Sequence, residues 1–308
     1  MNDPMKRVLV IMTTFNSEKW IEDQLNSILN QHDVSIYLSI FDDGSTDKTI
    51  SILERYSQRN DNIRVELNEL PFRNPGKNFI NAVCLNKSED YDYFAFSDHD
   101  DIWKLDKIKS AIDKLVDEHA EGYSCSVTPF TNSKLYKDSK QCSSKRKLDF
   151  IFEGAGQGCT FVLSNKLYNN VRKFFINNKE EIAPFYYHDW LVYIFARNMN
   201  MKWFFDERSF IYYRQHAHNN IGSKFSLSSI MKRYELIING WYKSQICTAL
   251  TLSNRIASNE VLHRFTILFN SKKSIQRKLR MATYIFQYGR RKIIERIILV
   301  FFVLSGHI

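Results

Sequence analysis

The sequence predicts an α/β protein with a mainly parallel, doubly wound sheet and a C-terminal helical extension. Three observations support this fold class. Short apolar runs alternate with amphipathic segments through the first hundred residues, two of those runs end in clusters of aspartates, and only helical periodicity remains after about residue 222. Alternating strands and helices form a parallel sheet because right-handed crossover helices return each strand in the same direction.

The first part of the chain contains four strand and helix pairs. The hydrophobic pattern predicts strands at 8–12, 36–41, 63–67 and 91–96, and helices after about residue 17, after residue 46, at 77–85 and at 104–118. Asn16 or Ser17 could cap the first helix and Thr46 the second, because their side-chain oxygens accept hydrogen bonds from the unpaired N–H groups of a first turn.

The second part of the chain is less regular. We expect, in order, a strand at 123–130, a polar loop at 131–147, a glycine-rich turn at 153–158, a strand at 159–163, helices from about residues 165 and 189, and short strands at 202–205 and 208–213. The change to helices alone suggests two parts, residues 1–222 and residues 223–308.

Composition limits the class of protein. The 308 residues are 44% hydrophobic, enough for a sizeable core. Five cysteines without a C-x-x-C pair argue for a reducing compartment and against a zinc ribbon or a disulfide scaffold. The first apolar run is too short for a signal peptide, so we expect a cytoplasmic protein.

The net charge of +9 is concentrated near the C-terminus, where Glu295 is the one acid among nine basic residues: Lys272, Lys273, Arg277, Lys278, Arg280, Arg290, Arg291, Lys292 and Arg296. This block could be a solvated helix face, a nucleic-acid patch or a surface attracted to anionic membranes. No nucleic-acid motif accompanies it, so we do not expect nucleic acid. The apolar run at 297–304 is too short to span a bilayer, but it could insert partway, pack on the core or contact a second subunit.

Three acids, Asp98, Asp100 and Asp101, follow directly after the strand at 91–96. Ligands of open α/β sheets bind just past the carboxyl ends of the strands. Crowded carboxylates raise one another's pKa unless a cation neutralises them. Asp98 and Asp100 could place oxygens on one hard ion such as Mg²⁺ or Mn²⁺, which commonly holds a diphosphate as its second partner.

A second acidic pair, Asp42 and Asp43, ends the strand at 36–41. One of these carboxylates could accept hydrogen bonds from a base or a ribose hydroxyl, or it could form an Asx turn that caps the next helix. The turn after the first strand contains neither a G-x-G-x-x-G nor a P-loop, which argues against a dinucleotide or an ATP site. Phe15 in that turn could stack on a base or belong to the core.

These segments form an ordered set: Thr-Thr-Phe-Asn at 13–16, Asp-Asp-Gly-Ser-Thr-Asp at 42–47 and Ser-Asp-His-Asp-Asp-Ile-Trp at 97–103. Together they resemble glycosyltransferase family 2, which has the inverting GT-A fold. Three further segments, Gln-Gly-Cys-Thr at 157–160, His-Asp-Trp at 188–190 and Tyr-Arg-Gln-His at 213–216, resemble the rhamnosyltransferase-like branch that builds bacterial surface polysaccharides. The resemblance covers about residues 6–222.

The resemblance implies roles for individual residues. It implies contacts to the nucleotide from Thr13, Phe15, Asp43, Asn78 and Asp98, a metal held by Asp98 and Asp100, and a general base at Asp189. The element around Asn78 is compressed relative to the family. Mn²⁺ or Mg²⁺ would be the cofactor.

Neighbouring residues could assist this chemistry. Arg214 and His216 could bind the diphosphate, and His216 could give the metal a further ligand. Asp101, Trp103 and His188 could touch substrate or diphosphate, although Trp103 and His188 could equally belong to the core. Asp189 could also act as a helix N-cap, and both roles are compatible because a helix N-terminus keeps a carboxylate ionised.

The resemblance implies a metal-dependent, inverting transferase at the inner face of the cell membrane, and rhamnose from dTDP-rhamnose is the first expected donor. The acceptor would be a growing surface polysaccharide or a lipid-linked glycan. UDP-hexose or UDP-N-acetylhexosamine is the alternative donor. A non-catalytic sugar-nucleotide-binding module and a metal-dependent phosphohydrolase remain as alternatives of other classes, and a homodimer remains open.

Overall fold

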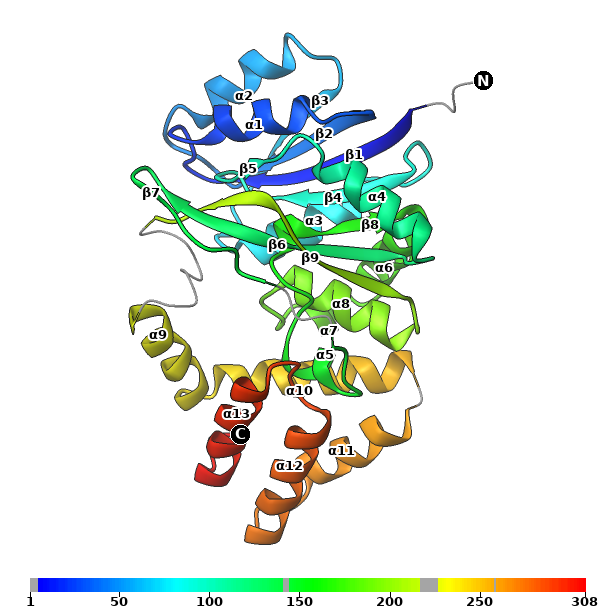
Figure 1. Ribbon diagram of the computed structural model, residues 1–308, viewed down its shortest axis with the longest axis vertical. Coiled ribbons are helices and arrows are strands. Elements are labelled where there is room, and N and C mark those ends of the chain that lie inside the picture. The colour runs from blue at the N-terminus through cyan, green and yellow to red at the C-terminus, as the bar shows by residue number, and fades with distance from the viewer. Residues whose placement is uncertain (1–4, 141–143, 217–226, 258) are drawn as a thin grey trace.

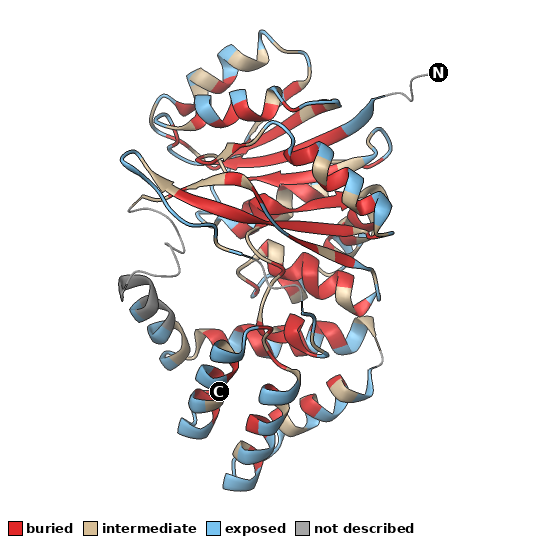
Figure 2. Ribbon diagram, in the orientation of Figure 1, coloured by how far each residue is buried: buried red, intermediate tan, exposed pale blue. Residues whose placement is uncertain are grey.

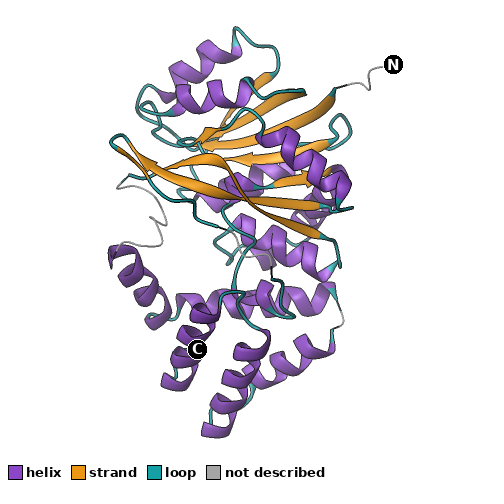
Figure 3. Cartoon of the chain, in the orientation of Figure 1, coloured by secondary structure: helices purple, strands orange, loops and turns teal. Residues whose placement is uncertain are grey.

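The computed structural model describes residues 5–140, 144–216, 227–257 and 259–308 (Figure 1). The boundary expected between residues 222 and 223 lies outside this part of the chain. Figures 1 and 3 show a twisted sheet with helices on both faces and a group of helices below it that contains the C-terminus.

In the described part of the chain nine strands form one sheet, and their bounds are β1 Lys6–Thr14, β2 Val34–Asp42, β3 Ile63–Leu67, β4 Tyr93–Ser97, β5 Ile102–Trp103, β6 Gly122–Thr131, β7 Lys134–Leu135, β8 Val162–Ser164 and β9 Trp203–Arg214. The helices of the sheet region are α1 Ile21–Leu29, α2 Thr49–Ser57, α3 Pro75–Leu85, α4 Lys107–Asp117, α5 Asp149–Phe152, α6 Asn165–Asn177, α7 Lys179–Ile182 and α8 His188–Asn198. The helices that follow are α9 Leu227–Ile238, α10 Trp241–Ile256, α11 Glu260–Asn270, α12 Ile275–Tyr288 and α13 Ile293–Ser305.

The strand order is β3-β2-β1-β4-β8-β6-β9-β5, and β7 pairs with β6. The strands β1 to β4 are mutually parallel, as the alternating pattern predicts. The sheet as a whole is mixed, because β8 runs antiparallel to both β4 and β6, and β5 runs antiparallel to β9. The α/β fold class is therefore confirmed, and its second half departs from the parallel pattern.

Two hydrophobic cores cover the two faces of the sheet. In β1, Val8, Val10 and Met12 point into the core that contains α1 and α4, whereas Leu9 and Ile11 point into the core that contains α3 and α8. A strand buried on both faces has an unbroken apolar sequence, which explains why this strand could be recognised so easily. Figure 2 shows the buried residues concentrated in the strands and in the helices directly below them.

Several local expectations are wrong. The first turn of α1 uses the carbonyl of Ser17, which accepts from Ile21 N–H at 3.0 Å, and neither Asn16 nor Ser17 caps it through a side chain. Thr46 does not cap α2 either, because Asp47 Oδ1 accepts from the Thr49 N–H at 2.9 Å. The strand expected at 159–163 begins as a 3₁₀ turn at Gly158–Thr160 and continues as β8. The two strands expected at 202–213 are one strand, β9, with a register shift against β6.

The C-terminal helices share a core with the lower face of the sheet. Ile246 on α10, Ile285 on α12 and Val303 on α13 belong to the same buried cluster as Phe79 and Leu191. Among the described residues, no helix is both long and apolar enough to cross a membrane.

A buried ionic network joins the C-terminal helices to the glycine-rich turn. Asp149 is fully buried and accepts hydrogen bonds from Arg197 and, at 3.0 Å, from Tyr193. Arg291, which precedes α13, lies 3.5 Å from the same carboxylate and donates to the carbonyl of Gly154 at 2.8 Å. The position of residues 153–158 therefore depends on a C-terminal arginine.

Candidate active site

The acidic turn between β4 and β5 is held by the end of β9. The pairing of β5 with β9 brings Arg214 to this turn, where its backbone N–H donates to Asp101 Oδ1 at 3.2 Å. Its Nε donates to the carbonyl oxygen of Asp100 at 2.8 Å. Arg214 is buried and also pairs with Asp23 of α1 at 3.1 Å, so it orders the acidic loop.

Asp100 and His216 face each other across this turn. Their Oδ2 and Nε2 atoms are 2.6 Å apart, and the imidazole stacks on Trp20 with ring centroids 4.2 Å apart. Burial alone would raise the pKa of Asp100, but the hydrogen bond to His216 and the charge of His99 hold that pKa below its usual value. The structure thus brings together two of the three residues expected to bind a metal.

The other two acids of the turn lie beside a thiol. One ligand atom from each of Asp98, Asp101 and Cys159 lies within 4.8 Å of the other two. Burial, followed by the charge of Asp100, raises the pKa of Asp98 to about 6. Burial and the charges of Asp100 and Asp98 raise the pKa of Asp101 well above its usual range.

These residues offer two ways to hold a divalent cation. Asp98, Asp101 and Cys159 are close together, but burial raises the pKa of Cys159 well above its usual value and keeps it a thiol. Mg²⁺ and Mn²⁺ prefer carboxylate and water oxygens, and Mn²⁺ also accepts imidazole. Asp100 and His216, whose ligand atoms already point at each other, therefore fit such an ion better, with Asp98 beside them.

Asp189 lies in the first turn of α8. Its Oδ1 accepts from the N–H of Trp190 at 2.7 Å, and Tyr187 occupies the N-cap position, so Asp189 is inside the helix and is not its cap. Burial raises the pKa of Asp189 to about 7, and the charge of Asp98 adds to the shift. That electrostatic interaction indicates that the carboxyl groups of Asp189 and Asp98 lie near each other.

Gly158 allows the loop before β8 to approach Asp189. A Cβ at this position would lie 2.8 Å from Nε2 of His188 and 3.2 Å from Cβ of Asp189. Any larger residue would displace the start of α8. The glycine-rich turn therefore serves close packing against the candidate base.

His188 and Trp103 are core residues. The His188 ring stacks on Phe79 at 3.9 Å between centroids and meets Phe96 edge-on; it is 8% exposed. Burial lowers the pKa of His188 to about 3, so the imidazole is neutral. Trp103 is 2% exposed. Direct contact of either ring with substrate is therefore not supported by this structure, because each is enclosed by other side chains.

The two acids at the end of β2 accept hydrogen bonds that fix the turns and loops around them. Asp42 accepts from Thr14 Oγ1 at 2.8 Å and from the Ser45 N–H at 2.8 Å, which is the Asx turn considered as the alternative. Asp43 accepts from the N–H groups of Phe72 and Arg73 at 2.7 and 2.8 Å, which fixes the loop after β3.

Asn78 supports the same region from α3. Its amide donates to the carbonyl of Phe41 at 3.0 Å and its oxygen accepts from Asn68, whose amide also donates to Asp43 at 3.1 Å. Asn78 is fully enclosed, so contact with a nucleotide would run through Asn68 or Asp43.

The end of β1 lies against the acidic turn. His99 Nδ1 is 3.3 Å from the carbonyl oxygen of Thr13. Phe15 is 52% exposed, so it is available to stack on a base and is not a core residue. Thr13 therefore lies next to the acidic turn that follows β4. Asp43 instead contacts the loop at residues 68–73.

Sequence reasoning missed Lys107 and Cys159. Lys107 is fully buried at the start of α4, 3.3 Å above the ring centre of Trp103, and its Nζ has no hydrogen-bond partner among the described residues. Burial lowers the pKa of Lys107 to about 8, while Cys125, Cys159 and Asp101 counteract the shift. A lysine at a helix start resembles a surface residue, so no pattern in the sequence could have revealed it.

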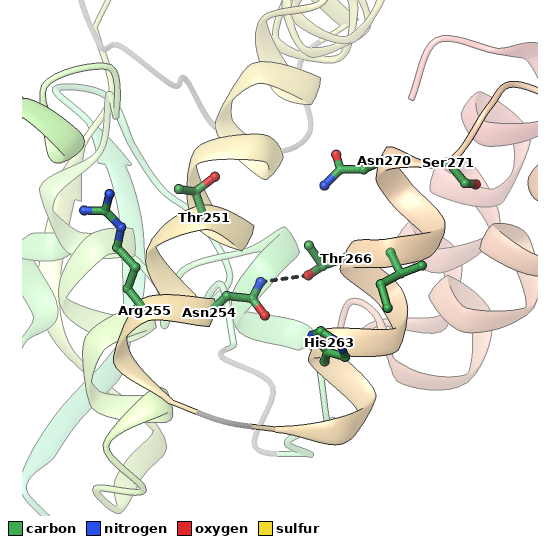
Figure 4. Close-up of a pocket in the computed structure, with 8 residues that line it drawn as sticks. Thr251, Asn254, Arg255, His263, Thr266, Asn270 and Ser271 are labelled. Carbon is green, nitrogen blue, oxygen red and sulfur yellow. Dashed lines mark hydrogen bonds between the residues drawn. The ribbon is translucent and has the colours of Figure 1, made fainter.

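A separate hollow lies between α10 and α11. It has a volume of about 620 Å³, and Figure 4 shows Asn254 and Thr266 joined across it by a hydrogen bond of 2.8 Å. The residues that line it are neutral or basic and belong to the C-terminal helices. It does not contain the acids described above and is not the candidate active site.

The fold and the cluster of acids after β4 are those of a sugar-nucleotide transferase, and the profile of the family described as Glycosyl transferase family 2 matches residues 9–182. The chain belongs to this family. It is 41% identical over 239 residues to the dTDP-rhamnosyl transferase RfbG of Shigella flexneri, an alignment that covers 76% of this chain and 82% of that protein. The chain is a glycosyltransferase of the rhamnosyltransferase-like branch.

Solved structures support the GT-A fold. S. aureus TarS 1–349 in complex with UDP-GlcNAc matches with a TM-score of 0.55 and 18% identity, over 92% of this chain and 81% of that chain. The mannosyltransferase PcManGT of Pyrobaculum calidifontis, in complex with GDP-Man and Mn²⁺, matches with a TM-score of 0.51 and 14% identity, over 96% of this chain and 87% of that chain.

Proposed function

We propose that this glycosyltransferase moves rhamnose from dTDP-rhamnose to a hydroxyl of a growing surface polysaccharide or a lipid-linked glycan, with inversion. The proposal is carried by the closeness of Asp98 to Asp100 and to Asp189, shown by the effect of these charges on each other's pKa, in a chain 41% identical to a dTDP-rhamnosyl transferase. Binding a nucleotide sugar without transfer would not require a carboxyl group with a pKa of about 7 beside these acids.

In this mechanism Asp189 accepts the proton of the acceptor hydroxyl. A carboxyl group with a pKa near 7 is a stronger base than an ordinary aspartate and is still largely ionised at slightly alkaline pH. One such base is sufficient for a single displacement with inversion at the sugar carbon. The backbone N–H groups of Trp190, which donates to Oδ1, and of Gly158 hold the carboxylate in place.

Asp100 and His216 would hold Mn²⁺ or Mg²⁺, with Asp98 as a further ligand or a ribose contact. The ion would neutralise negative charge on the departing diphosphate. Arg214 keeps the acidic loop in the shape that presents Asp100 toward His216. Thr13 and Phe15 would hold the nucleotide, with Phe15 stacked on the base, and Asp43 would act through the loop that it holds at residues 72 and 73. Asp101 would support the turn through its bond to Arg214.

We place the reaction at the inner face of the cell membrane. The acceptor is expected to be attached to a membrane lipid or to a chain assembled there, and the C-terminal helices carry the basic and apolar residues that such a location favours. Nucleic acid is not an expected partner.

A donor screen tests the proposal. The purified protein would be incubated with Mn²⁺, a lipid-linked acceptor fraction and, in turn, dTDP-rhamnose, UDP-glucose or UDP-N-acetylglucosamine. We expect transfer from dTDP-rhamnose and its loss in Asp100→Ala, with retained folding checked by circular dichroism. Transfer from a UDP-sugar alone would assign the alternative donor, and nucleotide-sugar binding without transfer from any donor would favour the non-catalytic module.

A further inference from the structure

The helix α13 has one buried side and one exposed apolar side. Its buried side contributes Leu299, Phe302 and Val303 to the core. The other side exposes six large apolar residues, of which Ile294 is 68% and Phe301 62% exposed: Ile293, Ile294, Ile297, Ile298, Phe301 and Leu304. At about 100° per residue these six fall within an arc of about 140°.

Two neighbouring helices extend this apolar surface. Exposed apolar residues on α12 are Ile275, Leu279 and Phe286, and those on α9 are Met231, Tyr234 and Ile238. The helices α12 and α13 pack together, and the ring of Tyr234 lies 5.5 Å from that of Phe302, which places α9 beside α13. Figure 1 shows α12 and α13 toward the end of the molecule farthest from β1–β3, with α9 to one side of them and nearer the sheet, and Figure 2 shows exposed residues on all three helices. Exposed apolar patches of this kind mark interaction sites.

Charge identifies the partner. Arg277 and Arg296 bond backbone carbonyls, and Arg290 and Arg291 pair with Glu153, so these four arginines are directed into the protein. Exposed basic residues remain at Lys272, Lys273, Arg280 and Lys292. The one acid of this segment, Glu295, pairs with Arg290 at 2.9 Å. An apolar surface bordered by unpaired cationic residues is complementary to an anionic lipid layer.

We propose that this surface of α9, α12 and α13 binds the protein to an anionic membrane, with the apolar side chains in the acyl boundary and the lysines at the lipid phosphates. This surface would bring the enzyme to a membrane-bound acceptor. The proposal rests on the proposed function for that role, whereas membrane binding itself does not depend on the sugar transferred. Since no described helix can cross a bilayer, the helices lie in the plane of the interface.

A second copy of the chain fits this surface less well. In a two-fold dimer the same patch meets itself, which would bring the exposed cationic residues of both copies together, and Glu235 is the one exposed acid among the described residues of these three helices. A lipid layer supplies the negative charge that a second copy lacks.

Vesicle co-sedimentation of the full chain tests the proposal, with vesicles of phosphatidylcholine alone or mixed with phosphatidylglycerol. The double variant Ile294→Ser/Phe301→Ser removes two exposed apolar anchors and should weaken binding about tenfold or more. The double variant Lys272→Gln/Lys273→Gln should weaken binding to the anionic vesicles about fivefold for each lysine, and added salt should abolish the difference. Val116→Ser, which removes an apolar side chain of α4 that is 57% exposed, is the matched control and should bind as the parent does.

Three outcomes would overturn the proposal: failure of the parent to bind anionic vesicles at low salt, equal binding by the parent and both double variants, or a parent dimer that becomes monomeric in Ile294→Ser/Phe301→Ser. The assay requires no donor sugar. Vesicle binding without rhamnosyl transfer would therefore refute the proposed function alone, and transfer in solution without vesicle binding would refute the docking surface alone.

Discussion

Two acidic turns end strands on either side of β1, and their carboxylates have different surroundings. Asp42 and Asp43, after β2, accept hydrogen bonds from hydroxyls and backbone N–H groups of their own turn and of residues 72 and 73. After β4, Asp101 is buried and Asp98 is half-buried beside it, and burial together with the charge of Asp100 raises the pKa of both. Backbone hydrogen bonds thus mark the acids that stabilise a loop, whereas raised pKa values mark carboxyl groups crowded together, where a cation or a proton can neutralise them.

The largest effect should come from Asp189, which belongs to the second kind. Asp189→Asn keeps the shape of the side chain and removes the base, so we expect the rate of transfer to fall about 10³-fold. Because burial disfavours the ionised carboxylate, the same variant should raise Tm by about 2 °C above pH 8. Steady-state kinetics and thermal melts measure the two effects. Transfer within tenfold of the parent rate would show that Asp189 is not the base.

The next effect concerns the cation. Mn²⁺ should raise Tm of the parent because it binds only the folded protein. Asp100→Asn should remove that rise and reduce transfer about a hundredfold, since Asp100 and His216 form the candidate pair. Differential scanning fluorimetry with and without Mn²⁺ measures the shift independently of activity.

Asp42→Asn is the matched control for this experiment. It removes a carboxylate that holds a turn, so it should lower stability by about 2 kcal/mol and leave the Mn²⁺-induced rise intact. If Asp42→Asn abolished the rise and Asp100→Asn preserved it, the assignment of the two turns would have to be exchanged.

The pH dependence of kcat/KM should follow the candidate base. The ionised form of Asp189 is the active one, and its pKa of about 7 means that kcat/KM should fall about tenfold per pH unit below pH 7 and level off above it. A rate profile at saturating Mn²⁺ measures this. A profile that stays flat down to pH 5 would mean that the base has an ordinary carboxyl pKa.

The sequence predicts the half of the sheet that contains β1 to β4 well. Parallel strands buried on both faces have continuous apolar runs, as β1 and β4 do, and β3, whose apolar and charged residues alternate, has the expected bounds as well. The sequence does not predict the strands whose position or direction depends on pairing with distant segments. The two residues of β5 have no detectable periodicity, and the direction of β8 depends on its neighbours β4 and β6. In β9 the charged pair Asp206 and Arg208 resembles a turn, but the two side chains pair with each other and the strand continues.

The site shows the same limit. The acids of the site could be predicted because a D-x-D after a strand is a local sequence pattern. Phe15 could be predicted as a site residue because it lies in the short turn that directly follows the first strand. The burial of His188 could not be predicted, since Phe79 and Phe96 reach it from distant segments. Trp103 lies under Lys107, which is only four residues away but is itself buried, and nothing in the local sequence indicates that burial. The same applies to the block of basic residues, in which Arg277, Arg291 and Arg296 are buried in contacts with distant carbonyls and acids.

The smallest effect on transfer should come from substitution of Arg291. This residue belongs to a third type of carboxylate environment, in which a buried acid is surrounded by cations. Asp149 is as buried as Asp101, but Arg197, Tyr193 and Arg291 surround it. Arg291→Met should cost about 3 kcal/mol of stability because it removes one cation from a buried network.

The same substitution releases the carbonyl of Gly154, which begins the turn that ends at Gly158 beside Asp189. We therefore expect kcat to fall about fivefold, with KM for the donor unchanged, because the base is displaced while the nucleotide contacts are not. Arg264→Met, which removes an exposed arginine of α11 paired with Glu260, should alter neither quantity and is the control. A rise in KM without a change in kcat would mean that the C-terminal arginine supports donor binding and does not position Asp189.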